Sequence, residues 1–573
     1  MLLSPHQDLR FEPFSRRGSY LNFRRFDDTT YPDEGRQGLF LRHCHGARFL
    51  SPWLARITVN GVEPLSQWDE AVLTLSPPNG GGHVEIAFDG TESLRLRGQG
   101  CALELEFETA PGASMYPTRC GAWEVNTRAC RRKVLLRAMV GELKTETDWH
   151  GEASKRMVAR FTTDQGDAWE GVLDYFDSTW IPRDPRSFDV CAAEVRADFA
   201  SFVEALPMAS DEFAASKRRA AYVNWSAIVE PCGQFRRPAM LMSKNYMSNV
   251  WSWDHAFNAM AHMAGDPALA WDQMLLMADR QNEHGAFPDA QNDVHEHFNF
   301  CKPPIHGWAV GLLRASNPGF FTPSRVRETI AWLEPWTRWW MNHRLWEDGG
   351  LPLYLHGNDS GWDNSTFFLR GVPVFTPDLP AFLALQCREL AHLHHLLGHR
   401  ADEIRWATEA DRLQNLLLKT LWDGERFFAL RLPGKEQVSA DTLIEAIPLV
   451  LGSALPLEVR DRVILRLKRY LTPFGLATEH PQSPHYTPDG YWRGPIWAPP
   501  TLLIIDGLQR SGEGTLAKEI ALRYLRLCTR SGFAENFDAL TGAPLRDKAY
   551  TWTSSVFLIL LSRLSEATPT LRD

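Results

Sequence analysis

The chain has 573 residues, a formal net charge of −9 (61 basic against 70 acidic side chains) and a hydrophobic fraction of 44%. This length predicts two to four domains, and the balance of apolar and charged residues excludes wholesale disorder, fibrous repeats and a collagen-like chain. Because phosphate binding needs clustered Lys and Arg, the negative charge argues against a nucleic-acid partner. No stretch approaches the roughly 18 apolar residues of a membrane span, and the first residues lack the pattern of a signal peptide.

Nine cysteines are scattered along the chain, and no two of them form a CxxC pair. In a chain of this size, that distribution predicts free thiols in a reducing compartment, and hence a cytoplasmic protein. Cys44 lies between His43 and His45, a run of side chains that bind metals elsewhere. A strand with two exposed histidines explains the same run, and we adopt that interpretation.

The first 188 residues have the alternation typical of strands. In residues 103–108, leucine and phenylalanine alternate with glutamate, a period of two with one face in water. Residues 84–88 follow a PPNGGG turn and precede an Asp-Gly pair. Further strand-like runs occupy 133–140 and 157–162. Many short strands joined by Gly, Pro and Asn turns predict a β-sandwich over residues 1–188. Because this region contains no concentrated catalytic motif, we expect a supporting domain.

From about residue 189 the pattern becomes helical. Residues 191–206 predict a connecting helix within the segment 189–210, and the clearest apolar stripe further on comprises Ile404, Ala407, Ala410, Leu413 and Leu417. Twelve helices are predicted in residues 211–573, at 211–227, 254–264, 267–284, 304–315, 324–344, 378–397, 402–420, 441–450, 456–470, 497–512, 514–530 and 550–565. Long polar loops between alternate pairs favour an (α/α)6 toroid, six helix hairpins closed into a ring. An open helical solenoid is the alternative, but no motif recurs at a fixed period.

Polar and aromatic residues gather in four loops between the predicted helices. The loops are residues 249–254 (NVWSWD), 357–365 (GNDSGWDNS), 489–497 (DGYWRGPIW) and 532–538 (GFAENFD). The chain also has 22 tryptophans, of which 16 follow residue 200. Flat indole faces stack on sugar rings, although a large helical core uses them too. Polar clusters on loops held by a rigid scaffold are typical of a binding site.

Two carboxylates in these loops suit acid–base catalysis. Asp363 stands between Trp362 and Asn364, where an apolar face would raise its pKa and keep it protonated as a general acid. Glu535 lies in the last of the four loops and would activate a water molecule. Since the two residues are 172 positions apart, they meet only if the ring brings both loops to one rim. The alternative is that each carboxylate caps a helix.

The combined motifs resemble a known enzyme family. They are SGWDNS (360–365), KPPIHGWAVG (302–311), DGYWRGPIW (489–497) and AENFD (534–538), and their order is that of the inverting glycosidases of the trehalase/glucosidase clan. Residues 200–573 are most similar to glycoside hydrolase family 63 and its mannosylglycerate/glucosylglycerate-hydrolase-like bacterial branch. The resemblance implies an (α/α)6 catalytic domain with Asp363 as general acid and Glu535 as general base. The long β-rich region departs from the small glycerate hydrolases, which weakens the case for a glycerate aglycone.

The other candidate site residues are neighbours of these carboxylates in the motifs. By the same resemblance, WSWDH places Trp253 and Asp254 around the sugar in the innermost subsite. The predicted stacking platforms are Trp253, Trp362, Trp492 and Trp497. The candidates for binding sugar hydroxyls are Asp254, Asn358, Asp359 and Asn364. We predict that Arg493 either binds hydroxyls or an anionic aglycone, or fixes its loop by a salt bridge.

No metal and no cofactor are expected. His295 and His297 form an HxH pair without an evident third ligand, and hydrolysis by two carboxylates needs no metal. The sequence has no GxSxG, no Walker loop and no GxGxxG after a strand. A serine hydrolase, an NTPase and a dinucleotide enzyme are therefore without support.

We predict an inverting, exo-acting α-glycosidase, with an α-glucosidase as the first choice. An α-mannosidase or a mannosyl- or glucosylglycerate hydrolase is the alternative. Two further classes are a phosphorylase, which needs phosphate in place of the activated water, and a sugar epimerase or lectin-like binder, for which His255, His284 and His306 are available. The expected partner is a small oligosaccharide or glycoside. Two roles stay open for the N-terminal domain, narrowing of the pocket and formation of a homo-oligomer.

Overall fold

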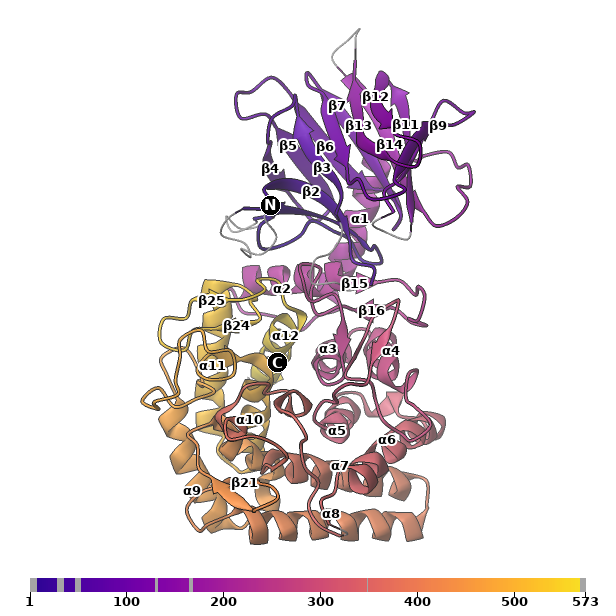
Figure 1. Ribbon diagram of the computed structural model, residues 1–573. Coiled ribbons are helices and arrows are strands. Elements are labelled where there is room, and N and C mark those ends of the chain that lie inside the picture. The colour runs from indigo at the N-terminus through magenta and orange to yellow at the C-terminus, as the bar shows by residue number, and fades with distance from the viewer. Residues whose placement is uncertain are drawn as a thin grey trace, which may run out of the picture.

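The computed structural model describes residues 8–27, 36–46, 53–128, 132–163, 168–347 and 349–566. An N-terminal domain of β-strands precedes a C-terminal region of helices (Figure 1), as the sequence pattern predicts. Within these ranges, no helix combines the length and the apolar character needed to cross a membrane. The cysteines in the described ranges are all free thiols.

Two antiparallel sheets form the N-terminal domain in the described part of the chain. Their strands are β1 (Leu21–Phe26), β2 (Gly38–His43), β3 (Trp53–Val59), β4 (Leu65–Trp68), β5 (Val72–Ser76), β6 (His83–Phe88), β7 (Ser93–Gln99), β8 (Leu103–Phe107), β9 (Ser114–Pro117), β10 (Trp123–Asn126), β11 (Lys133–Val140), β12 (Glu142–Trp149), β13 (Ser154–Thr162) and β14 (Ala168–Phe176). One sheet has the order β1-β2-β3-β8-β13-β12 and the other β4-β5-β6-β7-β14-β11-β10-β9. The four predicted strands correspond to β6, β8, β11 and β13.

The two sheets pack through apolar side chains. Along β8, Leu103, Leu105 and Phe107 are buried, and the glutamates between them are half-buried or exposed, which is the predicted alternation. Between the sheets, Phe161 of β13 stacks on Trp169 of β14 with ring centroids 5.4 Å apart. The N-terminal domain therefore has a two-layer core.

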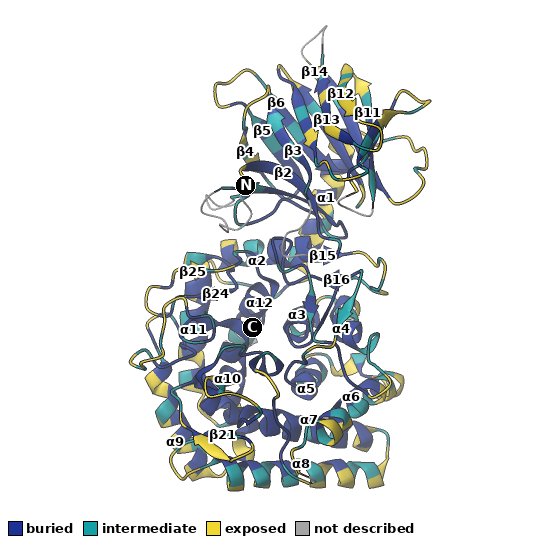
Figure 2. Ribbon diagram, in the orientation of Figure 1, coloured by how far each residue is buried: buried dark blue, intermediate teal, exposed yellow. Residues whose placement is uncertain are grey.

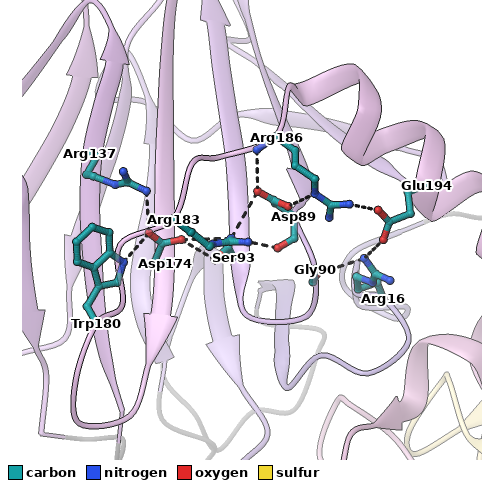
Figure 3. Close-up of polar contacts among 10 residues, drawn as sticks. All are labelled: Arg16, Asp89, Gly90, Ser93, Arg137, Asp174, Trp180, Arg183, Arg186 and Glu194. Atoms are coloured by element: carbon teal, nitrogen blue, oxygen red, sulfur yellow. Dashed lines mark hydrogen bonds and ion pairs between the residues drawn. The ribbon is translucent and has the colours of Figure 1, made fainter.

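Ionic contacts fix the segment that joins the two parts. The connecting helix is α1 (Phe188–Glu204), close to its predicted position. Just before it, Arg186 donates to the buried Asp89 at 2.7 Å and also pairs with Glu194 of α1, which lies 3.8 Å from Arg16 (Figure 3). A buried carboxylate needs a charged or hydrogen-bonding partner. These contacts therefore hold the start of α1 against the β-domain and its N-terminal segment.

Helices α2 to α12 and the 3₁₀ segment η4 form most of the C-terminal region. They are α2 (Ala214–Ala227), α3 (Asp254–His262), α4 (Pro267–Ala278), α5 (His306–Ser316), α6 (Pro323–His343), α7 (Asp378–Leu396), α8 (Arg400–Leu421), η4 (Leu443–Ala454), α9 (Leu457–Leu467), α10 (Ala498–Arg510), α11 (Gly514–Ser531) and α12 (Thr551–Glu566). In the order α3, α5, α7, η4, α10 and α12, each contacts the next, and α12 contacts α3. These inner elements close a ring of mostly buried residues, and α8 outside it exposes one face (Figure 2).

Two predicted helices differ from the structure. The helix predicted over 267–284 ends at Ala278, because the side chain of Asn282 accepts hydrogen bonds from main-chain N–H groups of a following turn. The segment predicted as a helix over 441–450 is the 3₁₀ segment η4. Pro448 lies inside it, and since proline has no N–H, a regular α-helical hydrogen bond is missing there.

The four polar and aromatic loops all precede inner helices. They lead into α3, α7, α10 and α12, in the order 249–254, 357–365, 489–497 and 532–538. Two of the loops touch directly, since the side-chain amide of Asn364 donates to the carbonyl of Gly490 at 3.1 Å. The loops therefore meet at one end of the ring, where the inner helices begin.

Candidate active site

A buried carboxylate fixes the loop that carries Asp363. Asp359 is 1% exposed and pairs with Arg344 at 3.0 Å. Its two oxygens also accept hydrogen bonds from three main-chain N–H groups, at 3.0 to 3.2 Å. Asp359 thus shapes the loop through contacts within the protein, and its binding of a sugar hydroxyl stays a prediction.

Asp363 follows a turn that packs on an indole ring. Gly361 has a φ of 74°, and a Cβ at this position would lie 2.6 Å from the ring of Trp253, so the turn requires glycine. Burial raises the pKa of the Asp363 carboxyl, and the positive charge of Lys302 and a hydrogen bond with Tyr491 oppose this rise. A raised pKa suits a general acid, because the carboxyl must carry a proton when the substrate binds.

Lys302 is a site residue that we did not predict. It is buried, its ammonium group pairs with Asp289 at 3.1 Å, and it donates to the main-chain carbonyl of Asn358 at 2.8 Å. Its positive charge also acts on Asp363 and Asp254. Lys302 is the first residue of the KPPIHGWAVG motif, which is the sequence signal that points to it. Asn358 contributes its carbonyl here, and a hydroxyl-binding role of its side chain stays a prediction.

Main-chain contacts hold Glu535 on both sides. Its N–H donates to the carbonyl of Asp547 at 2.7 Å, and its own carbonyl accepts from the indole N–H of Trp552 at 3.1 Å. Glu535 is 4% exposed. Burial raises the pKa of its carboxyl to about 8, and the nearby carboxyl of Asp547 adds to this rise. A carboxylate with a pKa near neutrality is well suited to take a proton from water.

Asp254 is a second fully buried carboxyl at the same place, beside the half-buried Asp363. It begins α3, and the hydroxyl of Tyr550 donates to it at 3.4 Å. Burial raises the pKa of Asp254 to about 7. The pKa of Tyr491 is raised by burial and then by the charges of Asp363, Glu535 and Asp254, so all three carboxyls lie close enough to act on this phenol through their charge. The fold thus brings together two loops that are far apart in the sequence. We did not predict the two tyrosines, although Tyr491 lies in the DGYWRGPIW motif.

The four candidate tryptophans form a packed aromatic wall. Trp492 and Trp497 stack in parallel with ring centroids 4.0 Å apart, and Trp362 and Trp253 lie 5.0 and 6.0 Å from Trp492. All four side chains are at most 2% exposed. Trp492 covers one face of Trp497. Contact of any of the four tryptophans with a sugar stays a prediction.

Asn364 and Arg493 connect the loops. The side chain of Asn364 donates to the carbonyl of Gly490 and accepts from the N–H of Trp492 at 2.9 Å. Each end of this amide thus makes a contact that joins the two loops, and the binding of a sugar hydroxyl by Asn364 stays a prediction. Burial raises the pKa of Glu479 to about 7, and the positive charge of Arg493 opposes this rise. That proximity agrees with the loop-fixing alternative for Arg493.

The histidines of the ring are engaged in its packing. His255 and His306 are fully buried with ring centroids 5.2 Å apart, and burial lowers the pKa of both, to about 4 for His255. His284 is exposed at the surface, away from this pair. In the described ranges, His295 and His297 belong to no group of three side chains that could hold a metal ion. The arrangement therefore favours chemistry by carboxyls over chemistry by paired histidines.

Comparisons with known proteins place this site in a family. The family model described as "Mannosylglycerate hydrolase MGH1-like glycoside hydrolase domain" matches residues 247–553, more than half of the chain. A mannosylglycerate hydrolase of Thermus thermophilus is 24% identical over 397 residues, which cover 54% of this chain and 93% of that protein. A mannosylglycerate hydrolase of Rubrobacter radiotolerans is 25% identical over 430 residues, covering 58% and 93%.

Solved structures share the fold. A GH63 mannosylglycerate hydrolase from Thermus thermophilus in complex with glucose has a TM-score of 0.52 at 21% identity, and the match covers 59% of this chain and 98% of that chain. A bacterial glucoamylase complexed with acarbose has a TM-score of 0.66 at 10% identity, and the match covers 99% of this chain and 95% of that chain. The likeness to the glucoamylase thus extends over both the β-rich domain and the helical region.

Proposed function

The chain belongs to the family of mannosylglycerate hydrolase MGH1-like glycoside hydrolases, and on this premise we propose that it is an inverting, exo-acting α-glycosidase. We further propose that residues 211–573 form an (α/α)6 catalytic toroid, which residues 189–210 connect to a β-sandwich supporting domain, residues 1–188. The closed ring of inner helices and the two antiparallel sheets support this division. The protein is a glycoside hydrolase. We propose its stereochemistry, its substrate and the roles of its residues.

In the proposed mechanism, protonated Asp363 donates its proton to the glycosidic oxygen while Glu535 takes a proton from water. The water attacks the opposite face of the anomeric carbon, so the configuration inverts. The observation that carries this proposal is that the buried Glu535 and Asp254 and the half-buried Asp363, carboxyls from separate loops, all act on the pKa of the Tyr491 phenol. In this mechanism Asp254, at the start of α3, binds hydroxyls of the sugar.

We propose an α-linked glucosyl unit as the first substrate. The alternative substrate is mannosylglycerate. Two relatives that match over 93% of their own length are named mannosylglycerate hydrolases. An α-mannosidase, a phosphorylase and a sugar epimerase are outcomes that the experiment must separate.

The experiment is a panel of α-glucosides, α-mannosides, trehalose, glucosylglycerate and mannosylglycerate, read by released monosaccharide. Each is incubated with and without inorganic phosphate, and a sugar phosphate appears only if the protein is a phosphorylase. Asp363→Asn and Glu535→Gln serve as matched controls, because each removes a proton-transfer group and keeps the shape of the side chain. Release of glucose that neither substitution reduces would contradict the proposed roles.

A further inference from the structure

A loop of the helical region lies against the N-terminal domain. We call residues 243–248 the bridging loop. The ammonium group of Lys244 in this loop is buried and donates to main-chain carbonyls of Arg16 and Ser19 and to the hydroxyl of Ser15, at 2.5 to 3.3 Å. The loop is thus fastened to the segment that precedes β1.

Two arginines of the β-domain hold the next residues of the bridging loop. Arg42 in β2 donates to the carbonyl of Asn245 at 3.1 Å. Arg24 in β1 donates to the hydroxyl of Tyr246, and its guanidinium group lies 3.9 Å from the centre of that ring. Both arginines are 1% exposed. Because charged side chains are rarely buried without partners, these contacts mark an interface that is built into the fold.

Asn245 continues this interface toward the candidate base. Its side-chain nitrogen donates to the carbonyl of Phe11 and to the carboxylate of Asp547, each at 2.8 Å, so both of its N–H bonds are used. The N–H of Tyr246 lies 3.4 Å from the other oxygen of the same carboxylate. The main-chain carbonyl of Asp547 accepts the hydrogen bond from the N–H of Glu535 at 2.7 Å. Three hydrogen bonds thus lead from the N-terminal segment to Glu535.

We propose that Asn245 and Asp547 are positioning residues for Glu535, and that the N-terminal domain completes the catalytic centre through them. This inference rests on the proposed function, since it concerns the base of that reaction. A base must hold its water on one face of the sugar, and small displacements of a catalytic group reduce the rate strongly. Asp547 also acts through its charge, because its carboxyl adds to the raised pKa of Glu535.

The first test is the kinetics of the full-length Asn245→Ala variant on an aryl α-glucoside, or on an aryl α-mannoside if only mannosides are hydrolysed. The variant loses both donors, so Asp547 is no longer joined to the Phe11 carbonyl. We expect kcat to fall about 10- to 100-fold, because a displacement of about 1 Å at a catalytic centre can reduce the rate about 10²-fold. KM is expected to change less than about threefold, because the substitution removes no contact with the sugar.

The second test is the pH dependence of kcat/KM for Asp547→Asn, which keeps the shape of the side chain and removes its charge. The limb on the acid side follows the deprotonation of Glu535. Without the charge of Asp547, the pKa of Glu535 falls, so this limb is expected to move to lower pH. If Asn245→Ala does not fold, Asp547→Asn still tests the positioning role. An acid-side limb at the same pH as in the unaltered enzyme would contradict the proposal.

Arg218→Gln is the matched control at the same domain interface. Arg218 in α2 pairs with Glu70 of the N-terminal domain at 2.7 Å, and no contact of this pair leads to Glu535 in the described residues. We expect kcat of this variant to stay within about twofold of the unaltered enzyme. A similar loss in Arg218→Gln, or an unchanged kcat in Asn245→Ala, would overturn the positioning role and leave the proposed function intact. Full activity of Glu535→Gln would overturn both.

Discussion

Replacing Glu535 by glutamine is expected to stabilise the fold while it removes the proposed base. Burial raises the pKa of this carboxyl from 4.5, the ordinary value, to about 8. Between these two pH values the folded state binds more protons than the unfolded state, so rising pH lowers the stability of the unaltered protein. The penalty is absent below pH 4.5, grows as the pH rises and is complete above about pH 8. Glutamine does not titrate and therefore escapes it.

The size of the effect follows from the two pKa values of Glu535. One pKa unit corresponds to about 1.4 kcal/mol, so the ionised carboxyl lowers the free energy of unfolding by about 1 kcal/mol at pH 5 and by about 4 kcal/mol at pH 8. The advantage of Glu535→Gln is thus expected to increase by about 3 kcal/mol over this interval.

Urea unfolding followed by tryptophan fluorescence measures this difference, because most of the 22 tryptophans lie in the helical region. Unfolding curves of the unaltered protein and of Glu535→Gln are compared at pH 5 and pH 8. The exposed Glu513 before α11 offers a control, since Glu513→Gln makes the same replacement at a glutamate that is not buried. An advantage of Glu535→Gln that does not grow with pH would refute the inference that Glu535 is a destabilised, buried carboxyl.

Asp363→Asn is expected to lower kcat about 10²- to 10⁴-fold on a natural glycoside, because a general acid contributes that much. The loss is expected to be far smaller on a glycosyl fluoride, whose leaving group needs no proton. A loss below tenfold on the natural glycoside would remove Asp363 from the mechanism. Treatment with EDTA is expected to leave the hydrolysis rate unchanged, and a complete loss that a divalent ion restores would instead show that a metal takes part. Trp497→Ala is expected to lower the free energy of unfolding by about 3–5 kcal/mol, as for other buried tryptophans. The reason is that the ring is 1% exposed and stacked on Trp492. A loss below about 1 kcal/mol in urea unfolding would place the ring outside the core.

Periodicity predicted the helices well because it depends only on near neighbours in the chain. It placed α8 within two residues at each end, yet it misjudged part of the buried face. Ala410, Leu413 and Leu417 are buried as expected, but Ile404 is 51% exposed and Trp406 is buried instead. The packing partner of a helix decides such details, and that partner, α7, is not readable from the stripe.

The candidate site shows the same limit at longer range. Asp363 and Glu535 could be proposed from the sequence, because a carboxylate beside tryptophan and asparagine in a glycine-flanked loop is a local pattern. The loop contact of Asn364 could not be predicted, because its residue type suits either a sugar or a loop contact and its partner Gly490 is 126 positions away. Lys302 could not be predicted, although it begins the KPPIHGWAVG motif. Only the fold places its ammonium group beside Asp289 and lets its charge act on Asp363.

The stereochemistry of hydrolysis is the most direct test of the pairing of Asp363 with Glu535, because it depends on the two residues acting as an acid and a base. In an inverting enzyme the two carboxyl groups stand about 6.5–9.5 Å apart and leave room for water, whereas a retaining enzyme holds them about 5–5.5 Å apart and forms a covalent intermediate. Proton NMR of the first product released from an α-glycoside distinguishes the two. With Asp363 as acid and Glu535 as base, the β-anomer is expected to appear before mutarotation, and the α-anomer as first product would contradict this pairing.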